Sequence, residues 1–200
     1  MSWEDDWLSR EDEEDLEVAA SFRPVSGGAA AFFEEAQAGV IRFLVSQVAE
    51  LVSADSTAAD ADIDSGDLEA QLGLSNHAQL PDDPVLARLL PDGYSDDPAA
   101  SAEFRRYTEE TLRSGKIGAA QTVLSSLPPG GGQVRLSEPE CQQWLKALND
   151  VRLALSVRLG ITDENEDLSE RLSAEDPRAA YVWVYQWLAY LQESLVESLS

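Results

Sequence analysis

The chain has 200 residues, of which 44% are hydrophobic, so it is long and apolar enough to bury one core. Its 38 acidic residues against 14 Lys and Arg give a formal net charge of −24. This charge argues against direct binding of nucleic acid, because a protein holds that backbone by replacing condensed counterions with basic groups. A single cysteine excludes an intramolecular disulfide and any metal site built from several cysteines, and fits a reducing compartment.

The sequence lacks the patterns that lead a chain into or across a membrane. Its first residues, MSWEDDWLSREDEED, contain no basic segment followed by an apolar run. No uncharged apolar stretch reaches the roughly 18 residues that a membrane span needs. We therefore expect neither secretion nor membrane insertion, and the expected location is cytoplasmic.

Residues 1–20 carry nine Asp and Glu residues against Arg10 alone. A run of like charges repels itself and stays solvated, so we expect a flexible acidic arm. Trp3 and Trp7 interrupt the run, and alternation of Trp with acids is typical of a tail that docks on a basic, apolar groove of a partner. The alternative is an arm whose tryptophans pack locally.

Residues 21–200 are expected to form a single, mainly α domain, a compact helical bundle with a small N-terminal β-hairpin. The hairpin is predicted around Ser26-Gly27-Gly28, and Pro24 confines its first strand to an edge. A helix is predicted over residues 34–53. Its expected inner face consists of Ala36, Val40, Ile41, Leu44, Val48, Leu51 and Val52.

Residues 54–83 are acidic and poor in large apolar side chains, which predicts a mobile acidic loop. Three aspartates alternate from Asp60 onward, but Ser65 and Gln71 stand where an EF-hand requires Gly and Glu, so this is a poor match to a calcium loop. His77, the only histidine, has no second histidine or nearby cysteine with which to bind a metal.

Two helices are predicted in the middle of the chain, from Pro84 to Leu90 and from Asp97-Pro98 onward. The expected cap of the first is Asp82 or Asp83. Residues 119–127 are expected to form a separate short helix, and the Pro-Gly run over residues 128–132 a hinge. The expected inward side chains of the second helix are Phe104, Tyr107, Thr108, Leu112 and Ile117.

Arg105 and Arg106 belong to the most basic stretch of the sequence and are candidate interaction residues. They could form an anion site. The alternative is ion pairing with Glu103, Glu109 and Glu110, which lie at helical spacing from these arginines.

The best-formed helix is predicted over residues 137–160, where Ser137 and Glu140 form a capping box and Gly160 ends the helix. The last helix is predicted to begin at Asp176-Pro177. Apolar side chains recur in both at spacings of three and four, so we expect the two helices to bury each other as an antiparallel pair. The facing residues are Trp144, Leu148, Val151 and Leu155 on one, and Val184, Trp187, Leu188 and Leu191 on the other, broadened by Tyr181, Trp183 and Tyr190.

The central helix also carries candidate functional residues. Cys141 is a candidate redox residue, because it lies near a helix N-terminus, which lowers the pKa of a thiol. The neighbouring Glu138 and Glu140 raise that pKa. The alternative is that Cys141 serves as a small buried apolar side chain. Asn149, Asp150 and Arg152 are candidate interaction residues that could line a cleft. Their alternative role is Arg–Asp pairing that fixes helix packing.

Nothing in the sequence predicts a catalytic centre. His77 has no nearby nucleophile or carboxylate partner, and no pair of carboxylates can be singled out among 38 acids. We therefore expect no enzyme activity, no cofactor and no metal.

Three motifs stand out in the C-terminal half: DDPAASAEFRRYTEETLRSGK, WLKALNDVRLALSVRLGIT followed by an acidic loop, and YVWVYQWLAYLQESLVESL. In combination they resemble the actinobacterial family DUF2017. The resemblance implies an oxidative-stress transcriptional regulator of the AosR type, a kind of protein often encoded beside the adaptor of the Clp protease and cysteine-synthesis genes. The redox role in the family depends on two nearby cysteines, and that disulfide cannot form in a chain with Cys141 alone.

Because the charge argues against DNA contact, the expected partner is a protein such as a sigma factor or RNA polymerase. The alternative is a non-enzymatic binding or scaffold domain linked to a protease adaptor or to cysteine biosynthesis. The sequence leaves the oligomeric state open, and a dimer is compatible with it.

Overall fold

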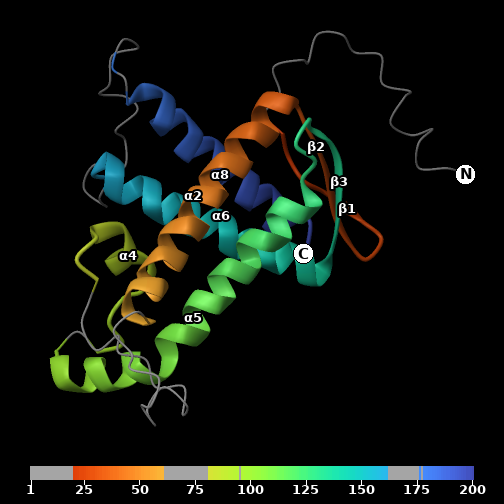
Figure 1. The fold of residues 1–200 in the computed structure, drawn as a ribbon. Helices are drawn as coiled ribbons and strands as arrows, with labels where there is room; N and C mark the ends of the chain where they lie inside the picture. The colour runs from red at the N-terminus through yellow and green to blue at the C-terminus, as the bar shows by residue number, and fades with distance from the viewer. Residues whose placement is uncertain (1–19, 61–80, 95, 162–175, 177) are drawn as a thin grey trace, which may run out of the picture.

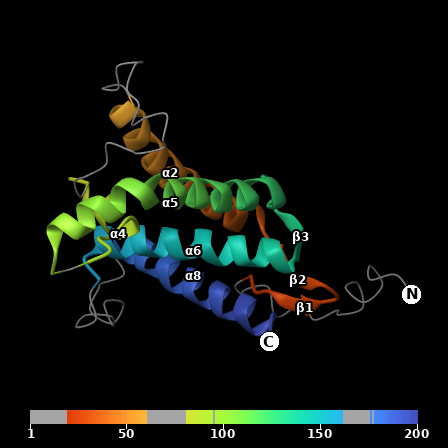
Figure 2. The same ribbon diagram turned by 90° about the horizontal axis from the view of Figure 1, so that it is seen from below.

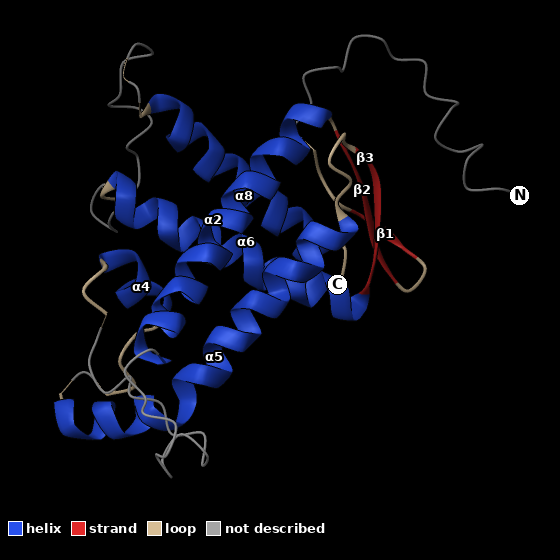
Figure 3. Cartoon of the chain, viewed as in Figure 1, coloured by secondary structure: helices blue, strands red, loops and turns tan. Residues whose placement is uncertain are grey.

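The computed structural model describes residues 20–60, 81–94, 96–161, 176 and 178–200, and it is mainly α-helical, as predicted (Figures 1 and 3). The helices in these residues are α2 (Glu35–Asp60), α4 (Pro84–Leu89), α5 (Pro98–Ser126), α6 (Glu138–Leu159) and α8 (Ala179–Glu197). The strands are β1 (Arg23–Val25), β2 (Gly28–Phe33) and β3 (Gly132–Ser137). None of these helices is long and apolar enough to cross a membrane.

Helix α6 lies in the middle of the fold, between α5 and α8 in Figure 2, and it also contacts α2, α4 and the sheet. The predicted capping box is present, since the Ser137 backbone N–H donates to Glu140 Oε2 at 2.8 Å. Gly160 ends the helix in the left-handed conformation, with φ of 67°. The predicted burial of Trp144, Leu148, Val151 and Leu155 is confirmed, and α6 contacts α8. On α8 the predicted residues Trp187, Leu188 and Leu191 are buried, whereas Val184 is half-buried.

The predicted hairpin is also confirmed, and the sheet has a third strand. Its order is β1-β2-β3, with both pairs antiparallel, so β1 and its Pro24 lie at an edge. We expected residues 128–132 to be a hinge and predicted no strand after them. In the structure β3 begins at Gly132 and pairs with β2, about 100 residues earlier in the chain. Gly28 permits this pairing, because a Cβ there would overlap the Leu136 carbonyl.

A cluster of three aromatic rings joins the sheet to the helices. The ring centroid of Trp144 lies 5.5 Å from that of Phe22 and 5.8 Å from that of Phe33. The indole Nε1 of Trp144 donates to Ser126 Oγ at 2.9 Å, which satisfies the polar end of a fully buried side chain. The hairpin, the end of α5 and the start of α6 are thereby held at one point.

Three predicted boundaries were wrong. Helix α2 continues to Asp60, so residues 54–60 are helical rather than loop, since no Pro or Gly interrupts them. Helix α5 runs without a break to Ser126, because burial of its last turns offsets the weak helix propensity of its glycines. Helix α8 begins at Ala179 rather than at Asp176-Pro177. The Asp176 side chain accepts from the Arg178 backbone N–H at 2.9 Å, just before the helix. The remainder of the predicted acidic loop up to residue 80, with His77, lies outside the described residues.

The predicted inner faces were partly wrong as well. In α2 the core side chains are Ala38, Ile41, Val45 and Val52, while Ala36 and Val40 are exposed. In α8, Tyr181, Trp183 and Tyr190 are exposed rather than part of the core. Both helices carry apolar residues on more than one face, so helical spacing alone does not identify the buried side.

The central position of α6 predicts the effect of shortening one of its core side chains. Leu148→Ala removes part of a fully buried side chain and should lower the free energy of unfolding by roughly 2–5 kcal/mol. The matched control is Leu112→Ala, at an exposed leucine of α5, with a change within about 0.5 kcal/mol. Urea unfolding followed by circular dichroism measures both, and equal effects would show that Leu148 is not core.

Candidate functional site

The buried face of α5 near its start is charged rather than apolar. Arg105, Glu109 and Arg113, which we call the α5 charge cluster, occupy successive turns and are nearly inaccessible to solvent. The Glu109 carboxylate accepts from Arg105 Nη1 at 2.8 Å and from Arg113 Nη2 at 2.7 Å. At the outer end, Arg105 Nη2 donates to Asp92 Oδ1 at 2.8 Å. The predicted inward residues Phe104, Tyr107 and Leu112 are exposed instead.

The α5 charge cluster fixes α5 to its neighbours. Arg113 Nη1 donates to the Val52 carbonyl of α2 at 2.6 Å, and Arg105 Nη1 donates to the Leu90 carbonyl at the end of α4 at 3.1 Å. The role that the structure supports for Arg105 is therefore the ion-pairing alternative, because a side chain that is 5% exposed offers little surface to a partner. Arg106 is half-buried, and its interaction role stays a prediction.

Cys141 is fully buried in the main core beneath the sheet. Burial raises the pKa of its thiol, and the two glutamates beside it add to this effect. Both factors lower the fraction of thiolate, which is the form that oxidants attack. The surroundings of Cys141 are those expected for a small buried apolar side chain, the alternative considered from the sequence. A redox role for Cys141 stays a prediction.

The three candidate residues of α6 do not form one group. Asp150 is buried and accepts from Lys116 Nζ of α5 at 2.6 Å; burial raises the pKa of its carboxyl, while the lysine opposes that shift. Arg152 turns toward α8, where Nη1 donates to Gln192 Oε1 at 2.9 Å and the guanidinium carbon lies 4.9 Å from the centre of the Tyr185 ring. Asn149 is exposed. Asp150 and Arg152 therefore do not form the pair considered from the sequence: Asp150 pairs with α5 and Arg152 contacts α8.

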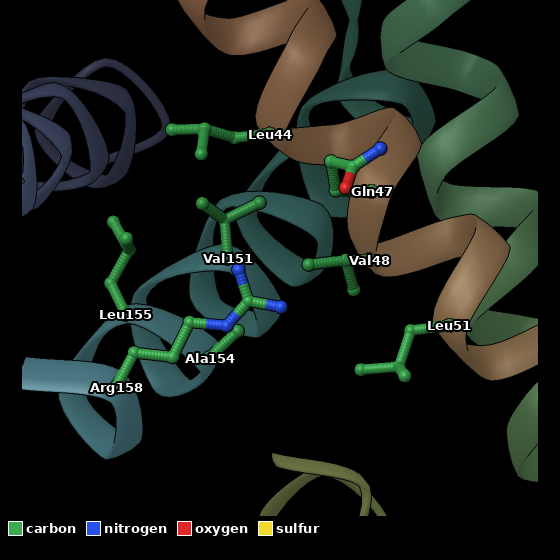
Figure 4. A pocket seen from close by; sticks show the side chains of 8 residues that line it. All are labelled: Leu44, Gln47, Val48, Leu51, Val151, Ala154, Leu155 and Arg158. Carbon is green, nitrogen blue, oxygen red and sulfur yellow. The ribbon is translucent and has the colours of Figure 1, made fainter.

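A groove between α2 and α6 was not predicted from the sequence (Figure 4). We call it the α2–α6 groove. It is lined by Leu44, Gln47, Val48, Leu51, Val151, Ala154, Leu155 and Arg158. All but two of these side chains are apolar. Arg158, on the last turn of α6, is exposed and forms no hydrogen bond or ion pair with the other described residues.

The apolar surface of the groove continues along α2. Val40 and Phe43 are exposed, the latter by 62% of its surface. Together with Leu44, Gln47 and Leu51 they recur at helical spacing, so they form one stripe on the side of α2 that borders the groove. Contiguous exposed apolar surface next to polar residues is typical of a protein contact site. The near-continuous apolar composition of α2 is the sequence feature that could have indicated it.

The remaining candidates, Trp3 and Trp7, lie outside the described residues. Their predicted role in an interaction arm stays a prediction. Among the residues that are described, no group of His, Cys, Asp and Glu side chains could hold a metal ion.

Comparisons with known proteins agree with the motifs of the C-terminal half. The family model named DUF2017, a domain of unknown function, matches residues 19–199, so this mainly helical chain belongs to that family. Its relatives include proteins named oxidative stress regulator AosR from Mycobacterium tuberculosis and Mycobacterium bovis. Each is 41% identical over 151 residues, which is 68% of this chain and 68% of the relative. No solved structure gives a significant match.

The α5 charge cluster predicts a strong response to loss of its one carboxylate. Glu109→Gln keeps the size of the side chain but removes the negative charge that two buried guanidinium groups share and replaces one acceptor oxygen by a donor NH2. This should lower the free energy of unfolding by roughly 3–5 kcal/mol. Glu103→Gln, at an exposed glutamate of the same helix, is the control and should change it by about 0.5 kcal/mol or less. A loss below about 1 kcal/mol in Glu109→Gln would contradict the structural role of the cluster.

Proposed function

We propose that the chain is an oxidative-stress regulator that acts by contacting another protein, and that it has no catalytic activity of its own. The observation that carries this proposal is the 41% identity to proteins named oxidative stress regulator over two thirds of both chains. The net charge of −24 favours protein contact over DNA contact, because the field around the molecule repels phosphate.

The contact surface in this proposal is the α2–α6 groove together with the exposed stripe of α2. The groove is small, with a free volume of about 20 Å³, so it can take no more than the tip of one side chain. The exposed stripe of α2 offers most of the surface, because its apolar side chains recur at helical spacing and can pack against the apolar face of a partner helix. Arg158, whose guanidinium lies among the side chains that line the groove in Figure 4, adds a positive charge that no other described residue pairs. The partner segment that fits is therefore an amphipathic helix with a carboxylate placed to reach Arg158.

The proposed partner class is a sigma factor or RNA polymerase, and the proposed setting is the cytoplasm. The relatives are named oxidative stress regulators, and a protein that regulates such a response at transcription must contact either DNA or the transcription machinery. The acidic surface favours the second route.

Binding of purified sigma factors and RNA polymerase from the same organism tests the proposal. Phe43→Ala should raise the Kd about tenfold or more, because a central aromatic anchor carries a large share of an interface. Tyr107→Ala is a matched control, since both side chains are 62% exposed and only Phe43 borders the groove. Arg158→Glu should also weaken binding and reverse the effect of added salt on the charge contact.

Two results would contradict the proposal. One is specific binding by none of these partners; the other is an equal loss of affinity in Phe43→Ala and Tyr107→Ala. Thermal unfolding of each variant shows whether a loss of affinity reflects a loss of fold. Transcript profiles of a deletion strain under peroxide distinguish regulation from the scaffold alternative, because a profile identical to that of the wild type favours a scaffold.

A further inference from the structure

Both lysines of the chain line the same cavity. Lys116 on α5 and Lys146 on α6 belong to a polar cleft of about 440 Å³ between these helices, which we call the α5–α6 cleft. Its other lining residues are Thr111, Leu112, Gly115, Gln143, Asn149 and Asp150. In a chain with 38 acidic residues, placement of both ammonium groups at one cavity is a local reversal of the overall charge.

The polar groups of the α5–α6 cleft are mostly free to bind a ligand. Lys116 is partnered, because it donates to Asp150 at 2.6 Å, and the two charges cancel. Lys146, Gln143 and Asn149 form no hydrogen bond or ion pair with the rest of the described chain. The cleft therefore has one uncompensated positive charge and two free side-chain amides. Lysine and amide N–H groups are donors, so the group they suit is an anion with several acceptor oxygens.

Gly115 lines the α5–α6 cleft and leaves room in it, because it has no side chain. It lies inside α5, where glycine lowers helix stability by about 1 kcal/mol relative to alanine. Its backbone does not require glycine, since its φ is not positive, and an added Cβ would meet no atom within 4 Å. A larger side chain at Gly115 would therefore extend into the cleft without meeting other atoms of the protein.

The cleft also offers an apolar surface. Leu112, which the sequence placed in the core, is exposed at the wall of the cavity, one turn before Lys116. Pockets for small molecules combine apolar walls with a few polar groups that fix orientation, and their volumes begin near 300 Å³. The cavity is therefore large enough for a small organic molecule rather than only for a bare ion.

We propose that the α5–α6 cleft binds a small organic anion, whose carboxylate is held by Lys146 and the amides of Gln143 and Asn149 and whose apolar part lies against Leu112. This goes beyond the proposed contact with a partner protein, because the cleft is formed by α5 and α6 and the α2–α6 groove by a different pair of helices. Binding of such a metabolite would give the protein an effector site.

The test titrates the full-length protein with succinate, glutamate and inorganic phosphate at constant ionic strength, and follows binding by isothermal calorimetry and by amide chemical shifts. At least one of the two carboxylates should bind, with shifts centred on the lining residues of the cleft. Lys146→Gln should weaken that binding about tenfold or more by removing a charged hydrogen bond. Arg88→Gln, at an exposed arginine of α4 away from the cleft, should leave it unchanged.

A second pair of variants separates the site from general effects on α5. Gly115→Leu should fill the cavity and abolish binding, whereas Gly118→Ala raises the helix propensity of α5 at a position outside the cleft and should not affect binding. Thermal unfolding shows that both variants are folded.

Three results would overturn this inference. The first is that neither succinate nor glutamate binds at concentrations up to about 10 mM, since a Kd above that value is too weak for a specific ligand. The second is equal binding by the wild type and Lys146→Gln. The third is binding of phosphate alone, which would assign the cleft to an inorganic anion. Because the cleft variants leave the α2–α6 groove intact, they should retain the binding of the partner protein, so failure here is distinguishable from failure of the proposed function.

Discussion

Burial of Trp144 at the start of α6 is the interaction on which the rest of the structure depends. The indole ring is in contact with Phe22, just before β1, and with Phe33 at the end of β2, and its N–H donates to Ser126 at the end of α5. Further along α6 the side chains are buried by α2, α4 and α8. Helix α6 therefore contributes side chains to both hydrophobic clusters of the described residues. Its packing also positions the α2–α6 groove and the α5–α6 cleft, because α6 forms one wall of each.

The charged inner face of α5 determines what is left on the surface. Because Arg105, Glu109 and Arg113 point inward, apolar residues of the same helix are displaced to solvent, and Leu112 reaches the α5–α6 cleft. The ion pairs also hold α5 against α2 through the Val52 carbonyl. Charges buried in this way contribute geometry rather than net stability, since the cost of removing them from water is large.

The sequence predicted those features that depend on local chemistry. The capping box of Ser137, the stripes of α6 and α8 and the hairpin around Gly27 all follow from residues within one or two turns of each other. Strand β3 was missed because its pairing partner lies about 100 residues away. The inner face of α5 was wrong because helical periodicity assumes that buried residues are apolar, and Glu109 satisfies two arginines instead. The α2–α6 groove and the α5–α6 cleft are each formed where two helices pack side by side. The sequence of one helix does not show which helix lies next to it, so neither site was predicted.

Native-state hydrogen exchange of α6 tests most directly whether this helix is the centre of the structure. Backbone amides from Leu148 to Leu155 should exchange only by global unfolding, with a free energy of opening equal to the stability measured in urea. Amides in the exposed first turns of α5 and in the last turn of α8 should open at lower free energy. Exchange of the central α6 amides by local opening, at a free energy below that of α5 or α8, would contradict the account.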